Sequence, residues 1–330
     1  MTLCSKEPPP QMALRQKPPR IPGIPQGGTS RPPVFTSRCC KLPHVDQTAV
    51  GSDAIESRGV YSHCPHGENG DPDFRRNGMW MIVTVAVIVI LIAAVAVVAL
   101  PLLTWRGLPE GAKINGMYLV KDGFVSAGLV PLSDHEVALV DAGNDVQGKA
   151  LLAELSRRGL SPDDVKVILL THGHRDHMAG IAKFPKAQVM ALAAEVDVVE
   201  GRSSGGGPIL RFRSPRPTGI RLSRTLQDGE VMQLGPYLVR VFAVPGHTPG
   251  SAAYAIGENL FMGDSANQSK DGRLKEAPWV FSKSAAQNRK SLVELARRLA
   301  SDSSIKTLVF AHSAPLERGV APLVEFASRC

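Results

Sequence analysis

The most informative absence in this chain is cysteine. Its five cysteines are Cys4, Cys39, Cys40, Cys64 and Cys330, so residues 65–329 contain none. That long region can therefore form no internal disulfide, and it offers no thiolate ligand to a metal ion. A domain without disulfides can work in reducing or oxidising surroundings, so cysteine usage does not choose between the two kinds of compartment.

Strong charge of one sign is also absent. The formal net charge of +8 is spread over 330 residues. Such a thin surplus is common in soluble proteins, so we expect no nucleic-acid partner. One local run is richer in arginine and consists of Arg211, Arg213, Arg216, Arg221 and Arg224. We interpret it as a solvated loop, with an anion-binding role as the alternative.

Long apolar side chains are scarce in residues 1–78. This segment contains twelve of the 26 prolines of the chain. It cannot bury enough apolar surface to offset the entropy of ordering its backbone. We therefore predict a disordered, proline-rich N-terminal tail over residues 1–78.

Charge disappears completely in the segment that follows the tail. Residues 77–105 contain no charged side chain, and residues 81–100 are apolar apart from Thr84. Twenty helical residues at about 1.5 Å each span ~30 Å, the thickness of a bilayer core. We predict one transmembrane helix over residues 79–104, which makes membrane lipid a partner of the chain.

The flanks of this apolar run carry residues typical of membrane boundaries. Trp80 and Trp105 bracket it, and tryptophan favours the level of the lipid headgroups. Arg75 and Arg76 adjoin its N-terminal end. By the positive-inside rule, this placement predicts a single-pass protein whose C-terminal domain lies on the non-cytoplasmic side.

Residues 105–330 have the pattern of one globular α/β domain. Short apolar runs between turn residues predict strands, at 117–119, 124–125, 137–140, 165–170, 188–191, 231–234, 237–244, 252–256, 260–262 and 307–310. Apolar residues at helical spacing predict helices over 149–158 and 285–299, and a further helix over 178–183.

Three of the nine histidines fall within six residues. The segment His172-Gly173-His174-Arg175-Asp176-His177 directly follows the predicted buried strand 165–170. The carboxyl ends of strands are where open α/β sheets gather their ligands. Residues two apart in an extended segment point the same way, so His172 and His174 can hold one ion. Imidazole and carboxylate ligands without thiolate suit zinc, and manganese or iron less specifically.

Four other short motifs accompany this segment. They are Val140-Asp141-Ala142-Gly143, the stretch from Pro245 to Ser251 that reads PGHTPGS, Met262-Gly263-Asp264 and Ala311-His312-Ser313. With these motifs in this order, residues 113–316 resemble the metallo-β-lactamase fold superfamily. The resemblance implies an α/β fold, a four-layer αβ/βα sandwich with metals at the edge between its sheets. One position departs from the pattern, since Ala311 stands where the family commonly has glycine.

The resemblance also implies a set of metal ligands. His172, His174 and His247 would hold a first ion. Asp176, His177 and His312 would hold a second, and Asp264 would bridge both. Asp141 would orient a ligand imidazole, a support that such ligands usually need, and Gly246 and Gly250 would permit the turn that presents His247.

These residues predict a membrane-anchored hydrolase with two zinc ions. A metal-bridging hydroxide would attack a small-molecule ester, lactone, thioester or amide-like substrate. Asp176 and Asp264 would be the catalytic carboxylates, with Asp176 orienting the nucleophile and passing a proton to the leaving group. Residues 202–219 and 270–283 would shape the pocket, with Trp279 and Phe281 as apolar walls.

The sequence is also compatible with two other functions. A phosphodiesterase or nuclease of the same fold would use the same ligands, and the arginine run would then hold its anionic substrate. A non-hydrolytic di-iron redox protein would also accept nitrogen and oxygen ligands. Glyoxalase-II-type thioesterases share the motifs, but the chain ends 18 residues after His312. We therefore expect no C-terminal helical domain of the kind that those enzymes use to hold glutathione.

Overall fold

The computed structural model describes residues 72–209 and 214–330. Nearly all of the predicted disordered tail lies outside the described residues, as do Arg211 and Arg213. The first described element is helix α1 (Pro72–Leu103). Its segment Met79–Val97 has a mean hydropathy of 3.0 and is long and apolar enough to cross a membrane, by length and composition. The helix thus covers the predicted span 79–104 except for its last residue.

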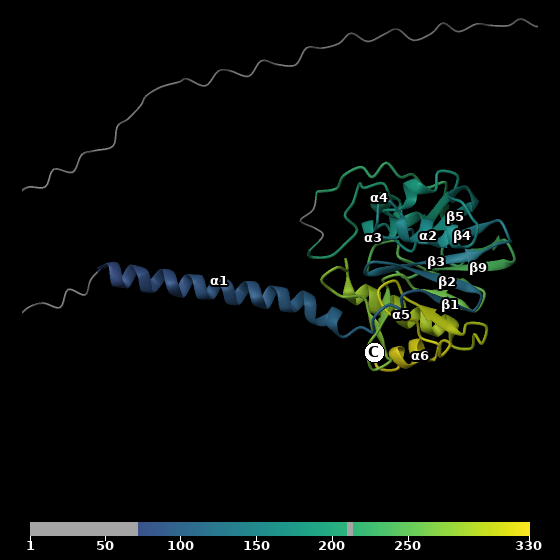
Figure 1. Ribbon diagram of the computed structural model, residues 1–330. Coiled ribbons are helices and arrows are strands. Elements are labelled where there is room, and N and C mark those ends of the chain that lie inside the picture. Colours follow the sequence, from purple (N-terminus) through teal and green to yellow (C-terminus); the bar gives the residue numbers. More distant parts are fainter. Residues whose placement is uncertain (1–71, 210–213) are drawn as a thin grey trace, which may run out of the picture. The chain divides into compact units, whose positions relative to one another are not determined.

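Two β-sheets form the centre of the domain (Figure 1). The first has seven strands in chain order, β1 (Ala112–Ile114), β2 (Met117–Asp122), β3 (Val125–Pro131), β4 (Val137–Val140), β5 (Val165–Leu169), β6 (Gln188–Leu192) and β7 (Arg224–Leu226). Strands β1 to β4 pair antiparallel, and β4 to β7 pair parallel. Parallel neighbours require crossover connections, which the helices of this half provide.

The second sheet has five strands in the order β14-β11-β10-β9-β8. Their bounds are β8 (Val231–Leu234), β9 (Tyr237–Ala243), β10 (Ala252–Ile256), β11 (Asn259–Phe261) and β14 (Thr307–Val309). All pairs are antiparallel except β11 with β14. A separate hairpin consists of β12 (Ala266–Gln268) and β13 (Leu274–Glu276).

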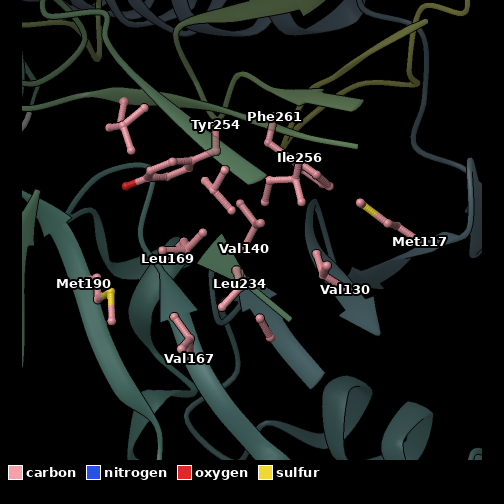
Figure 2. Close-up of a cluster of buried hydrophobic side chains, with 14 of the residues drawn as sticks. Met117, Val130, Val140, Val167, Leu169, Met190, Leu234, Tyr254, Ile256 and Phe261 are labelled. Carbon is pink, nitrogen blue, oxygen red and sulfur yellow. The ribbon is translucent and has the colours of Figure 1, made fainter. Parts of the chain in front are cut away.

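The main core lies between the two sheets (Figure 2). Alternate residues along each strand point into it, as the period of two requires. On β10, Tyr254 and Ile256 face this core, while Ala253 and Ala255 face the outer layer. The Tyr254 hydroxyl donates to the Leu170 carbonyl at 2.7 Å, so the one polar atom of this buried side chain is satisfied.

Helices cover the outer faces of both sheets (Figure 1). The first sheet packs against α2 (Lys149–Arg157), α3 (Arg175–Met178) and α4 (Val196–Val199). The second packs against α5 (Ala285–Leu299) and α6 (Ala321–Ala327). The resulting order of helix, sheet, sheet and helix confirms the predicted four-layer αβ/βα sandwich.

The helix predicted over 178–183 is wrong in position and continuity. Helix α3 spans Arg175–Met178, and a separate 3₁₀ turn follows at Ile181–Lys183. The His177 carbonyl accepts from Ala142 N–H at 2.6 Å, and Gly180 N–H donates to the Ala142 carbonyl at 3.2 Å. The loop after β4 thus takes the backbone groups that would otherwise have continued the helix.

Candidate metal centre

The predicted ligands follow strands that end at one edge of the sandwich. Strands β9 and β11 both run antiparallel to β10, and β14 runs parallel to β11, so these three share a direction. His247, Asp264 and His312 follow their carboxyl ends within four residues. In the first sheet, β5 ends at Leu169 and leads into the segment that contains His172 to His177. The topology therefore brings together residues that lie up to 140 positions apart.

Two glycines set the turns that present ligands from the second sheet. Gly246 has φ 139° and Gly263 has φ 52°, a range that side-chain-bearing residues seldom adopt. A Cβ at Gly246 would lie 2.2 Å from Asn288 N, and one at Gly263 would lie 2.5 Å from Thr171 Oγ1. Each glycine is thus required both by its backbone angle and by the close approach of a neighbour.

The first cluster of donors contains three histidines and one carboxylate. His174 Nδ1 lies 3.0 Å from both His172 Nε2 and His247 Nε2. Asp264 Oδ2 lies 3.4 Å from His247 Nε2 and 3.9 Å from His172 Nε2. All four side chains are buried, and their donor atoms lie within 4.8 Å of one another. We call His172, His174, His247 and Asp264 the first cluster.

The second cluster contains two histidines and two carboxylates. His312 Nε2 lies 3.3 Å from Asp176 Oδ2 and 3.2 Å from Asp264 Oδ1. His177 Nε2 lies 3.2 Å from Asp264 Oδ1 and 3.7 Å from Asp176 Oδ2. Asp264 is therefore shared by the two clusters, whose donor atoms again lie within 4.8 Å of one another. All seven predicted ligands come together.

The family model described as the metallo-β-lactamase superfamily matches residues 120–312 of this chain. The chain belongs to that superfamily. This confirms the resemblance drawn from the five motifs. The match includes every residue of both clusters.

Curated relatives of this superfamily member match part of its length. It is 32% identical over 139 residues to a hydroxyacylglutathione hydrolase of Serratia proteamaculans, covering 42% of this chain and 45% of the relative. It is 35% identical over 109 residues to the human metallo-β-lactamase domain-containing protein 1, covering 33% and 34%. The chain thus spans less than half the length of these curated relatives.

Solved metallo-β-lactamases share the fold. One described as the first B3 metallo-β-lactamase with an active-site glutamic acid superposes with a TM-score of 0.51 at 24% identity, covering 68% of this chain and 89% of its own. BJP-1, a subclass B3 enzyme of Bradyrhizobium japonicum, gives 0.50 at 20% identity, covering 68% and 92%. These likenesses concern the arrangement of the chain and carry nothing about substrate.

Asp141 connects the two clusters through hydrogen bonds to His177 and, by way of Thr171, to His172. Its backbone has φ 64°, an uncommon conformation that directs the loop after β4 toward the histidines. Asp141 Oδ2 lies 2.9 Å from His177 Nδ1 and accepts from Thr171 Oγ1 at 2.8 Å. Thr171 Oγ1 in turn lies 3.1 Å from His172 Nδ1. Because the threonine proton goes to Asp141, His172 donates to Thr171, and each of the two imidazoles, when neutral, has its lone pair on Nε2.

Hydrogen-bond partners of Nδ1 also determine the tautomers of two histidines that follow strands of the second sheet. His247 Nδ1 lies 3.2 Å from Ser282 Oγ, which itself donates to the Pro278 carbonyl at 2.8 Å. His312 Nδ1 lies 2.8 Å from the Phe124 carbonyl, which can only accept. Both rings therefore carry their proton on Nδ1 when neutral and direct an Nε2 lone pair at Asp264 and its neighbours.

The proton affinities of the two clusters differ. Burial lowers the pKa of His247 to about 4, and burial with the nearby His247 lowers that of His174 to about 3. Burial opposes protonation of His312 too, but the carboxylates of Asp264 and Asp176 outweigh it and raise its pKa to about 10. Burial would likewise raise the pKa of Asp176, yet the neighbouring histidines lower it to about 2.

The donor set fits a pair of divalent cations. Among the described buried atoms, His177 Nε2 and Asp264 Oδ1 have no hydrogen-bond partner, although they lie only 3.2 Å apart. A buried polar atom without a partner costs free energy, so such atoms call for an explanation. Cations held by nitrogen and oxygen would satisfy both atoms and would also balance the two carboxylates.

Glu195 is a residue of this centre that sequence reasoning missed. Its carboxylate is buried and accepts from Gly173 N–H at 2.8 Å, Gly250 N–H at 2.7 Å and Thr248 Oγ1 at 2.9 Å. Gly173 lies between two ligands of the first cluster, and Thr248 follows the third. Glu195 thus joins the two loops that supply the histidines of this cluster. A single glutamate outside any motif gave no signal in the sequence.

The predicted pocket loops contact each other beside the first cluster. Gly207 N–H donates to the Phe281 carbonyl at 3.1 Å, and Ile209 N–H to the Val280 carbonyl at 3.3 Å. The Trp279 side chain is 53% exposed, whereas Phe281 is half-buried. Since Ser282 contacts His247, both loops border the metal centre.

The described part of the arginine run is largely paired. Arg224 forms an ion pair with Glu230, and Arg221 lies 3.7 Å from Glu200. Arg216 is exposed. These pairs favour the interpretation as a solvated loop for the described members.

Proposed function

We propose that this chain is a membrane-anchored hydrolase with two zinc ions that cleaves an ester, lactone, thioester or amide-like bond in a small molecule. The observation that carries the proposal is the position of Asp264, whose two oxygens are shared between two complete donor clusters. Such sharing suits two ions that act together on one substrate. The matching regions of hydroxyacylglutathione hydrolases support a hydrolytic reaction.

The ligand roles follow from these positions. His172, His174 and His247 would hold one ion, and Asp176, His177 and His312 the other, with Asp264 between them. Two zinc ions bound there would lower the pKa of a shared water from 15.7 toward ~7 and polarise the bond under attack. Iron or manganese would also fit nitrogen and oxygen donors.

Asp176 is the carboxylate best placed to handle protons. Its side chain is 23% exposed, against 11% for Asp264. The neighbouring histidines keep the pKa of Asp176 at about 2, so it is an acceptor at neutral pH. In the reaction it would orient the attacking water, accept its proton and deliver that proton to the leaving group. Asp264 would serve catalysis by holding both ions in place.

Membrane anchoring belongs to the same proposal. Helix α1 would cross the bilayer once, with the catalytic domain on the non-cytoplasmic side and Arg75 and Arg76 on the other. Resistance of the full chain to extraction with alkaline carbonate would support an integral anchor. Full release into the soluble fraction would contradict it.

Metal analysis and a substrate screen test the catalytic part. The purified chain should hold about two zinc ions and should hydrolyse at least one member of a panel of esters, lactones, thioesters and β-lactams. Cleavage of phosphodiesters alone would favour the phosphodiesterase reading. Bound iron with a visible absorption spectrum and no hydrolysis would favour the redox reading and overturn the proposal.

A further inference from the structure

The end of helix α1 lies very close in sequence to a residue that touches the metal centre. The helix ends at Leu103, and the Trp105 ring stacks on the ring of His312 with centroids 6.1 Å apart and planes inclined by 27°. Two residues span at most about 7 Å. Any bilayer that holds the apolar run up to Leu103 therefore has its headgroup layer beside the second cluster.

Backbone hydrogen bonds fix this connection. Lys270 N–H donates to the Thr104 carbonyl at 2.8 Å, and Arg106 N–H donates to the Gln268 carbonyl at 2.9 Å. Ala314 N–H donates to the Arg106 carbonyl at 3.0 Å, two residues after His312. Residues 104–106 are thus part of the catalytic domain and not a free linker, so the anchor does not hold the domain at a variable distance.

Exposed apolar side chains flank both clusters. Phe124 is 59% exposed, and its ring lies parallel to that of His312 at 5.6 Å between centroids. Trp279 is 53% exposed, and its carbonyl accepts from the N–H of Ser282, whose Oγ lies 3.2 Å from His247 Nδ1. Large exposed apolar side chains grouped around a site indicate a surface that meets apolar material. We call these two exposed residues and the half-buried Trp105 the apolar rim.

Cationic side chains accompany the rim at the point where the anchor emerges. Arg106 and Lys270 are both exposed and lie on the two backbone segments that pair here, with Lys270 opposite Thr104 and Arg106 opposite Gln268. Lysine and arginine side chains near the end of a membrane-spanning helix extend to the level of the lipid headgroups. This arrangement suits a domain face that lies against a bilayer.

We infer that the metal centre faces the membrane and that its substrate is an amphiphile held in the bilayer, with a scissile acyl ester or amide at headgroup depth. This inference rests on the proposed function and narrows its substrate class. The apolar rim would contact the acyl chain near the carbonyl group. In the reaction, water adds its oxygen to the acyl carbon, the bond from that carbon to oxygen or nitrogen breaks, and the leaving group takes the proton. The products are a fatty acid and an alcohol or amine.

Two esters with the same leaving group separate this inference from general hydrolase activity. The zinc-loaded full chain is reconstituted in vesicles of phosphatidylcholine and phosphatidylglycerol. Hydrolysis of 4-methylumbelliferyl palmitate in those vesicles is compared with that of water-soluble 4-methylumbelliferyl acetate. We expect kcat/KM for the palmitate to exceed that for the acetate by at least about tenfold, a gain of about 1.4 kcal/mol.

A spacer variant tests the role of the anchor. Ten Gly/Ser residues inserted between Leu103 and Thr104 add a flexible reach of about 17 Å, more than the ~6 Å depth of a headgroup layer. The insertion leaves the domain and its ligands intact, so acetate hydrolysis should be unchanged while palmitate hydrolysis falls about tenfold. Equal rates on palmitate before and after the insertion would overturn the inference.

Rim variants provide a matched comparison. Trp279→Ser should lower palmitate hydrolysis about tenfold. Leu238→Ser removes a side chain that is 61% exposed near the start of β9, at the far end of that strand from His247, and should change neither rate. Equal effects of the two substitutions would contradict a specific rim.

A fluorescence measurement needs no catalysis. With Trp80→Phe and Trp105→Phe, Trp279 is the remaining tryptophan, and lipids brominated near the headgroup should quench it. Quenching of Trp279 without hydrolysis of either ester would contradict the hydrolase proposal and would still support a metal centre that faces the membrane. Acetate hydrolysis with no quenching would overturn the inference while the hydrolase proposal stands.

Discussion

The two donor clusters share Asp264 but are built from different chemistry. The first relies on three histidines that burial keeps neutral, and Glu195 joins their loops. The second adds Asp176 to Asp264, and its histidines have raised pKa values. One cluster therefore presents lone pairs that are ready to bind a cation, while the other must first release protons. Two adjacent sites on one scaffold can thus differ in how tightly and at what pH they load.

The largest effect should come from the residue that belongs to both clusters. Asp264→Ala removes donors from each, so we expect the zinc content to fall from about two ions to below one and the rate to fall by at least about 10³-fold. Asp271→Ala removes an exposed turn carboxylate and should change neither. Circular dichroism of both variants would verify that the fold is retained. A folded, metal-depleted Asp264→Ala protein with full activity would refute the catalytic proposal.

Single histidine substitutions should distinguish the clusters. His174→Ala should remove the ion of the first cluster and His312→Ala that of the second, each leaving about one zinc per chain, with rates lowered by about 10² to 10³-fold. His135→Ala is the control, since that side chain is exposed. Zinc content by elemental analysis provides the measurement. Retention of two ions in either ligand variant would contradict the assignment of that histidine.

Substitution of Glu195 should have a smaller effect, a loss of affinity for one of the two zinc ions. Glu195→Gln keeps the size of the side chain but turns an amide group toward one of its donors, Gly173 or Gly250. Partners that orient metal ligands typically contribute 10–100-fold to metal affinity. We expect a loss in that range for one of the two ions only, measured by competition with a chelator. Asp197→Asn, at an exposed position two residues later, should bind zinc normally.

The comparison also separates what the sequence predicted from what it could not. The three clustered histidines predicted a metal site, because three imidazoles within six residues at the end of one strand are typical of metal ligands. His247, Asp264 and His312 were found through short motifs after other strands. Short apolar runs predicted single strands such as 252–256, which is β10, whereas the core between two sheets was expected only from the family resemblance.

Contacts between distant segments left no such pattern. Glu195 accepts hydrogen bonds from two loops that follow strands of different sheets. Nothing in the adjacent sequence distinguishes it from a surface glutamate. Trp105 was expected at a membrane boundary, but its stacking on His312 depends on a bridge to Ser269 more than 160 residues away. Helix α3 was misplaced because backbone groups of the loop after β4 compete for its hydrogen bonds.

The smallest expected effect concerns the pH dependence of metal binding, and it tests the contrast between the clusters directly. The pKa of His312, about 10, and the raised pKa of His177 mean that the second cluster holds protons at pH 7, which an incoming cation must displace. Metal affinity of this cluster should therefore rise with pH up to about pH 10, by up to tenfold per unit for each proton released.

The first cluster should behave differently, because the pKa values of His174 and His247 lie at about 3 and 4. Its imidazoles are already neutral at pH 7, so its affinity should be nearly constant from about pH 6 upward. Titration calorimetry in buffers of different ionisation enthalpy counts the released protons. The His174→Ala variant, with the second cluster intact, should release more protons per zinc than His312→Ala. Equal release by both variants would mean that the two carboxylates do not raise the proton affinity of the second cluster.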